Sequence, residues 1–174
     1  MGSTVSLGFL LALLCLVAPQ EEDSKALLVR KLAQEMATAT LEGKFEELID
    51  LTYPAFVEST GGREKAIAAV RQGMAQMQEA GFRMEEFKVG QPGPLHSTDL
   101  HQFIVLPTET LIAGPQGKIK AKSYLLGISA DAGKTWKFVD GAGLQRKANR
   151  DRLPKLPEGF ELPPFSQPEL LPDK

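Results

Sequence analysis

Three side chains of this chain are the strongest candidates for a general base. Asp50 lies at the end of a helix-like segment, and His101 and Glu109 lie in strand-like segments. His101 alternates with Phe103 and Val105, so these three side chains share one face of a strand. A carboxylate or imidazole enclosed in an apolar pocket can accept a proton from a substrate. Asp50, His101 and Glu109 are therefore the catalytic candidates, with an exposed surface position as the alternative for each.

Four other side chains suit the lining of a pocket for an apolar ligand. Met74 and Met77 have flexible, polarizable side chains that adapt to irregular shapes. Tyr53 and Tyr124 combine an apolar ring with a hydroxyl group. These residues predict a ligand-binding site, and ordinary core packing is the alternative. Asp140, which ends a strand, is a further polar residue to consider.

The residues that usually hold metals and cofactors are scarce. The two histidines, His96 and His101, have no carboxylates at a spacing that would complete a metal site, and Cys15 is the only cysteine. We therefore expect no metal, no disulfide and no thiol catalysis. The segment Gly61-Gly62-Arg63 could hold an anion at the start of a helix, but it lacks the lysine of a phosphate-binding loop. No cofactor is expected.

Length and composition indicate one globular domain with terminal additions. The chain has 174 residues, of which 43% are hydrophobic and 24% charged, and its net charge of -2 gives no reason to expect nucleic-acid binding. Residues 1–20 have no charged side chain, and the apolar run from Val5 to Ala18 is typical of a secretory signal and short for a membrane span. We expect cleavage near Ala18 to Gln20 and a periplasmic or extracellular location. The expected division is a signal peptide at 1–20, a domain at 21–144 and a tail at 145–174.

Apolar residues at helical spacing predict three helices before any strand, at 24–41, 45–53 and 63–80. Asp23-Ser24 should cap the first helix, Pro54 should end the second, and Gly81 should close the third. Gly73 interrupts the third helix at a cost of about 1 kcal/mol relative to alanine, which predicts the close approach of a neighbouring segment.

The second half of the domain has the pattern of strands. Strands are predicted at 82–89, 100–106, 108–113, 118–128 and 134–139, with the second and third joined around Pro107. Short turns between them favour an antiparallel meander, and helices followed by strands indicate an α+β fold. After residue 144 the chain is first basic and then rich in proline. This tail is expected to be flexible, to lie on its own domain as a strap, or to bind a partner.

A turn motif joins the last two predicted strands. Ser129, Asp131, Gly133, Thr135 and Trp136 follow the pattern Ser-x-Asp-x-Gly-x-Thr-Trp, which resembles the Asp box of sialidase-type propellers. In such a turn the aspartate accepts backbone hydrogen bonds, and glycine takes a positive φ. Only one copy is present, whereas a propeller needs several at a fixed period. The motif therefore predicts a structural turn.

The order of elements resembles the nuclear transport factor 2-like superfamily, which includes the SnoaL-like proteins and the ketosteroid isomerases. The resemblance covers about residues 24–141 and rests on Leu51-Thr-Tyr53-Pro54 with Gly61-Gly62-Arg63-Glu64, and on Ser123-Tyr124-Leu125-Leu126 leading to Thr135-Trp136-Lys137-Phe138-Val139-Asp140. It implies a cone-shaped α+β roll, three helices on a curved antiparallel sheet, with a pocket at its open end and dimerisation through the sheet.

Fold alone does not determine function within such a superfamily. The favoured interpretation is an exported, non-catalytic domain that binds a small apolar ligand or a protein partner. The alternatives are a cofactor-free isomerase or lyase that acts in the cone pocket, and a structural interaction module.

Overall fold

The computed structural model describes residues 18–171, with side chains from residue 23 onward. The predicted signal segment up to residue 17, with Cys15, lies outside the described residues. The helices are α1 (Ala18–Glu42), α2 (Phe45–Leu51), α3 (Pro54–Ser59), α4 (Arg63–Glu79) and α5 (Lys147–Arg150), with the 3-10 turn η1 (Gly143–Gln145). The strands are β1 (Arg83–Val89), β2 (His96–Ser97), β3 (Gln102–Gly114), β4 (Gly117–Ser129), β5 (Lys137–Asp140) and β6 (Glu169–Leu171).

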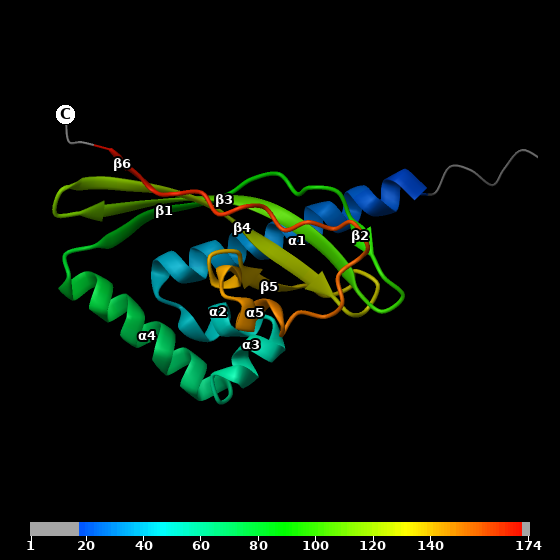
Figure 1. The fold of residues 1–174 in the computed structure, drawn as a ribbon, viewed down its shortest axis with the longest axis horizontal. Helices are drawn as coiled ribbons and strands as arrows, with labels where there is room; N and C mark the ends of the chain where they lie inside the picture. The colour runs from blue at the N-terminus through cyan, green and yellow to red at the C-terminus, as the bar shows by residue number, and fades with distance from the viewer. Residues whose placement is uncertain (1–17, 172–174) are drawn as a thin grey trace, which may run out of the picture.

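The six strands form one curled antiparallel sheet, so the predicted α+β class is confirmed (Figure 1). The main order is β1-β3-β4-β5, while β2 pairs with β3, and β6 pairs with β4. The long β3–β4 hairpin is paired from Gln102 with Ser129 to Gly114 with Gly117. The meander is therefore present in β3, β4 and β5, and β1 joins the sheet beside β3.

Pro107 does not divide the sheet as predicted, because β3 runs through it as one strand. The carbonyl oxygen of Pro107 accepts a hydrogen bond from Gly90 N at 2.8 Å, on the side of β1. On the same side of β3, the neighbouring strand changes from β2 to β1 near Pro107. The N–H group that proline lacks would point toward this break in the pairing. Proline is tolerated here because its missing N–H lies where the β1 pairing ends and not inside a continuous ladder.

Among the described residues, four helices precede the sheet, whereas the sequence predicted three. The additional helix is α3, which begins at Pro54. Proline suits the first position of a helix, where its missing N–H would have no partner inside the helix. Helix α1 begins at Ala18, before the Asp23-Ser24 pair that was expected to cap it. Gly73 is exposed, and a β-carbon added there would meet no atom within 4 Å, so the predicted close approach is wrong.

Each face of the sheet is covered by a separate apolar cluster. One face packs against α1, where Ile104 and Leu106 of β3 meet Val29 and Ala33. The alternate residues of β3, Phe103 and Val105, point to the other face, as the two-residue period of a strand requires. That second cluster is completed by the following buried and partly buried residues: Tyr124, Leu126, Ile128, Val139, Leu144, Tyr53, Phe56, Leu153, Leu156, Phe160 and Leu162.

The segment that covers the second face is the proline-rich tail, here called the C-terminal strap (residues 153–171). Leu156, Phe160 and Leu162 pack against the second cluster, and Figure 1 shows the strap crossing the sheet as an extended chain. The strap ends in β6, which pairs with Lys118–Lys120 of β4. The tail therefore contributes to the core of the domain, although Phe165 within it is 55% exposed.

The turn before β5 has the hydrogen bonds that its sequence predicts. Asp131 accepts from Thr135 N at 2.9 Å, from Thr135 Oγ1 at 2.7 Å and from Ser129 Oγ at 2.8 Å. Gly133 has a φ of 87°, and Trp136 Nε1 donates to its carbonyl oxygen at 3.1 Å. The hydrogen bond from the Thr135 backbone, followed by those of the two hydroxyl groups, lowers the pKa of Asp131 to about 2. The motif is therefore a structural turn.

Candidate functional site: a cleft between α4 and β1

A cleft of about 170 Å³ lies where α4, β1 and the end of α1 come together. Helix α4 is anchored at its start, where Ala66 and Ile67 pack with Ile49 of α2. Further along, α4 and β1 form a V, and the C-terminal end of α1 faces its interior (Figure 1). The lining of the cleft comes from all three elements and from the turn between α4 and β1: Leu41, Met74, Met77, Gln78, Phe82, Arg83 and Met84.

A helix-ending turn positions the two sides of the cleft. Gly81 has a φ of 80°, its N–H donates to Gln78 O at 2.9 Å, and Phe82 N donates to Met77 O at 2.8 Å. This is the hydrogen-bond pattern of a Schellman motif, in which glycine adopts the left-handed conformation. Because the turn is tight, β1 starts beside the end of α4, and the two elements then diverge as the V seen in Figure 1. Phe82 and Met84 are thereby placed opposite Met77.

The periodicity of each element directs the methionines into the cleft. Met74 and Met77 are three residues apart on α4 and so lie on one helix face. Met84 pairs across the sheet with Ile112 of β3. All three methionine side chains are partly buried, so they are sheltered from bulk water and still accessible.

The rim of the cleft is polar, but no acidic side chain lines it. Arg83 Nη2 donates to Glu85 Oε1 at 3.1 Å, and Glu85 also pairs with Lys118 at 2.7 Å. The ammonium group of Lys118, and then the guanidinium of Arg83, lower the pKa of the Glu85 carboxyl. The charge of Arg83 is therefore partly balanced along the strand, outside the cleft.

The four residues predicted to bind a ligand are divided between the two faces of the sheet. Met74 and Met77 line the cleft. Tyr53 and Tyr124 belong to the second cluster, under the C-terminal strap, where burial raises the pKa of both hydroxyl groups. The cleft residues that the sequence reasoning missed are Leu41, Gln78, Phe82, Arg83 and Met84. Only Met84 had a visible signal, as a third methionine shortly after Met77.

Two of the three predicted bases are engaged in surface ion pairs. Asp50 accepts two hydrogen bonds from Arg63, at 2.8 and 2.9 Å, and these lower the pKa of its carboxyl. Glu109 pairs with Lys120 at 2.8 Å, and this contact lowers the pKa of its carboxyl. A lowered pKa makes a carboxylate a weaker base. Arg63, which was considered for anion binding, instead ties the start of α4 to the end of α2.

The third predicted base, His101, lies just before β3 and is partly buried. Its backbone N–H donates to Thr98 Oγ1 at 3.0 Å, and its ring centroid is 6.1 Å from that of Phe103. These contacts place His101 in the β2–β3 connection. Asp50, His101 and Glu109 therefore lie on α2, before β3 and within β3, and none of them lines the α4–β1 cleft.

Asp140 is the one carboxyl among the described residues whose pKa is clearly raised. The residue keeps exposed surface, yet protein surrounds its carboxyl group, and this burial raises the pKa more than two hydrogen bonds lower it. Those bonds come from Ala142 N at 3.0 Å and from Ser123 Oγ at 3.4 Å. Asp140 therefore closes the turn after β5, where burial of its carboxyl group raises the pKa.

A larger hollow of about 290 Å³ lies on α1 beside α2, but it is a shallow surface depression. Charged side chains form much of its edge, and it lacks the aromatic and sulfur-containing side chains of the α4–β1 cleft. Its lining residues are Lys31, Gln34, Glu35, Thr38, Ala39 and Glu47.

In the described part of the chain, no group of three or more histidine, cysteine, aspartate or glutamate side chains could hold a metal ion. No helix within that same part is both long and apolar enough to cross a membrane. Comparisons with protein-family models and with curated proteins return no match to this chain.

Proposed function

We propose that this protein is an exported, non-catalytic member of the nuclear transport factor 2-like superfamily and that it binds a small apolar group in the α4–β1 cleft. The observation that carries the proposal is the lining of the cleft, where Leu41, Phe82 and three methionines surround a partly enclosed space without an acidic side chain. Ligand sites are typically concave and mostly apolar, with a few polar groups at the edge.

The size of the cleft limits the ligand. An apolar cavity of about 150 Å³ accepts benzene, so a cleft of about 170 Å³ matches one aromatic ring or a short branched chain. The ligand is then a small hydrophobic compound or the end of a longer one. An apolar side chain of a partner protein would fit the same space.

The alternative of a cofactor-free isomerase or lyase has one supporting observation, the raised pKa of Asp140. Perturbed carboxyl groups are frequent in active sites. However, Asp140 is bonded within its own turn and does not line the α4–β1 cleft. Asp50 and Glu109 have lowered pKa values, so the binding function is the better proposal.

A binding experiment with a matched control tests the proposal. Native mass spectrometry of the protein purified from its own host should detect a small apolar mass, and an apolar fluorescent dye should compete with that compound. Met77→Glu introduces a charge into the cleft and should weaken dye binding strongly. Gln76→Glu introduces the same charge on the exposed side of the same helix and should leave dye binding unchanged. Equal dye binding by both variants would show that the apolar site lies elsewhere.

A further inference from the structure

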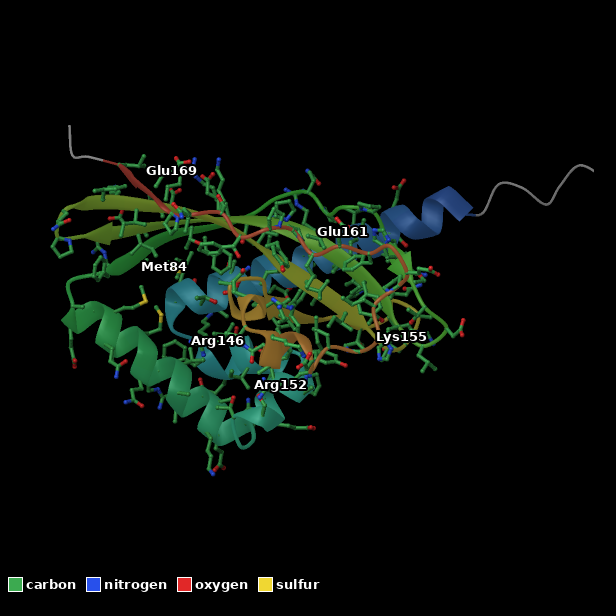
Figure 2. All side chains as sticks on the ribbon, viewed as in Figure 1. Met84, Arg146, Arg152, Lys155, Glu161 and Glu169 are labelled. Atoms are coloured by element: carbon green, nitrogen blue, oxygen red, sulfur yellow. The ribbon has the colours of Figure 1, made fainter. Side chains whose placement is uncertain are left out.

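The methionines of this domain are concentrated in one place. Four methionines lie in the part of the chain that the structure describes, and three of them line the α4–β1 cleft. The fourth, Met36, is 7% exposed and packs in the α1 cluster. Figure 2 shows Met84 beside the space between β1 and α4, where sulfur atoms are visible in yellow.

Three thioether sulfurs around one cavity can coordinate a metal ion, which an apolar lining alone cannot do. Thioether and thiolate sulfurs are soft ligands that select monovalent copper, whereas carboxylates and carbonyl oxygens suit magnesium and calcium. No carboxylate or imidazole lines this cleft, so it offers little to hard cations. We propose that the cleft binds a monovalent copper ion through the sulfur atoms of Met74, Met77 and Met84.

The backbone holds the three sulfur-bearing residues in a suitable arrangement. Residues three apart on a helix have β-carbons about 5–6 Å apart, so Met74 and Met77 provide two neighbouring sulfurs from α4. Met84 provides the third from β1, which the hydrogen bond of Phe82 N to Met77 O keeps close to the helix. The unbranched methionine side chain has three rotatable bonds, so small movements can bring the sulfurs together.

The surroundings suit a soft ion with a single positive charge. Leu41 and Phe82 are apolar members of the lining that limit the access of water. Arg83 is the one cation of the lining, and its guanidinium group is directed toward Glu85 at 3.1 Å. The expectation that the protein binds no metal considered histidine, carboxylate and thiolate ligands, and the thioether site lies outside that reasoning.

The proposed copper site lies in the same cleft as the proposed site for an apolar ligand. Copper binding does not depend on the proposed function. Leucine for methionine nearly conserves volume and apolar character but removes the sulfur. The triple variant Met74→Leu/Met77→Leu/Met84→Leu should therefore lose the binding of copper while keeping its fold, which circular dichroism checks. Failure of dye binding in the unmodified protein would count against the proposed function alone.

The experiment uses the full chain with Cys15→Ser in every sample, because a thiol is a stronger ligand for monovalent copper. Cu(I), kept reduced with ascorbate, is titrated against a chromophoric chelator, and Ag(I) serves as a redox-inert probe. Methionine methyl groups are observed by NMR. We expect shifts of the methyl signals of Met74, Met77 and Met84, and a loss of affinity of at least about tenfold in the triple variant.

Met36→Leu is the matched control, since it makes the same substitution in the core of the same domain. Its affinity for Cu(I) should stay within about twofold of the parent protein, and the Met36 methyl signal should not move in the parent. Absence of methyl shifts with both ions would overturn the proposal. So would affinity that survives in the triple variant, because the metal would then be bound elsewhere.

Discussion

The substitution Phe160→Ala tests whether the C-terminal strap is part of the stable core. Phe160 is partly buried, and its ring centroid lies 4.9 Å from that of His96 and 6.1 Å from that of Phe103. The ring therefore joins the strap to β2 and to β3. If these contacts persist in solution, their loss should destabilise the whole domain.

The expected magnitude follows from the burial of the ring. A fully buried phenylalanine costs about 3–5 kcal/mol when replaced by alanine, and an aromatic pair adds about 0.5–1.5 kcal/mol. Because Phe160 is partly exposed, we expect a value below that range, and the free energy of unfolding should fall by about 2–3 kcal/mol. For a domain of this size, this corresponds to a decrease in melting temperature of about 5–10 °C.

The assay is urea unfolding followed by the fluorescence of Trp136, which is the only tryptophan and is 1% exposed. Phe165→Ala is the matched control, because Phe165 belongs to the same strap but is 55% exposed. It should change the free energy of unfolding by less than about 0.5 kcal/mol. Equal, small effects of both substitutions would refute the reasoning, because the strap would then add little to stability in solution.

Four further outcomes are expected for the domain itself. Gly73→Ala should stabilise it by about 0.5–1 kcal/mol, because the position is open and helical. Gly127→Ala should destabilise it by about 1–3 kcal/mol, because the new β-carbon would lie 3.1 Å from two side chains of the core. Thermal unfolding of Gly73→Ala and Gly127→Ala measures both effects. Trp136→Phe leaves the carbonyl oxygen of Gly133 without its indole donor and should cost about 1–3 kcal/mol, measured by circular dichroism. The pKa of Asp131 is lowered from 3.8 to about 2, so its contribution to stability is present above about pH 4 and is lost as the pH falls toward 2. In Asp131→Asn the stability should change less across that acid range, and an NMR titration of the Asp131 carboxyl should give its pKa directly.

Local sequence signals predicted the elements more accurately than the site. The spacing of apolar residues located α2 and α4, and the turn motif predicted the hydrogen bonds of Ser129 and Asp131. The sequence also indicated Met74 and Met77, because methionines three apart on a helix must share a face. The sequence could not show that Met74 and Met77 share a cleft with Leu41 and Met84, since those two residues come from other elements.

Other candidate residues were placed by contacts that leave no sequence pattern. Asp50 and Arg63 are thirteen residues apart, and their ion pair exists only because α4 folds back beside α2. Tyr53 and Tyr124 were expected in the ligand pocket, but the alternation of the strands and the path of the strap place both in the second cluster. Which face a side chain occupies depends on the register of the sheet, and that register is set by distant pairings.

The sequence by itself determined the α+β class, most of the boundaries of the regular elements and the turn at residues 129–136. Each of these depends on interactions among residues close along the chain, such as helical periodicity, strand alternation and turn chemistry. Only the tertiary structure decided that the tail covers the second face of the sheet and that three methionines meet in one cleft. These features join residues far apart in sequence, and burial of their apolar side chains, which has no local signature, holds them together.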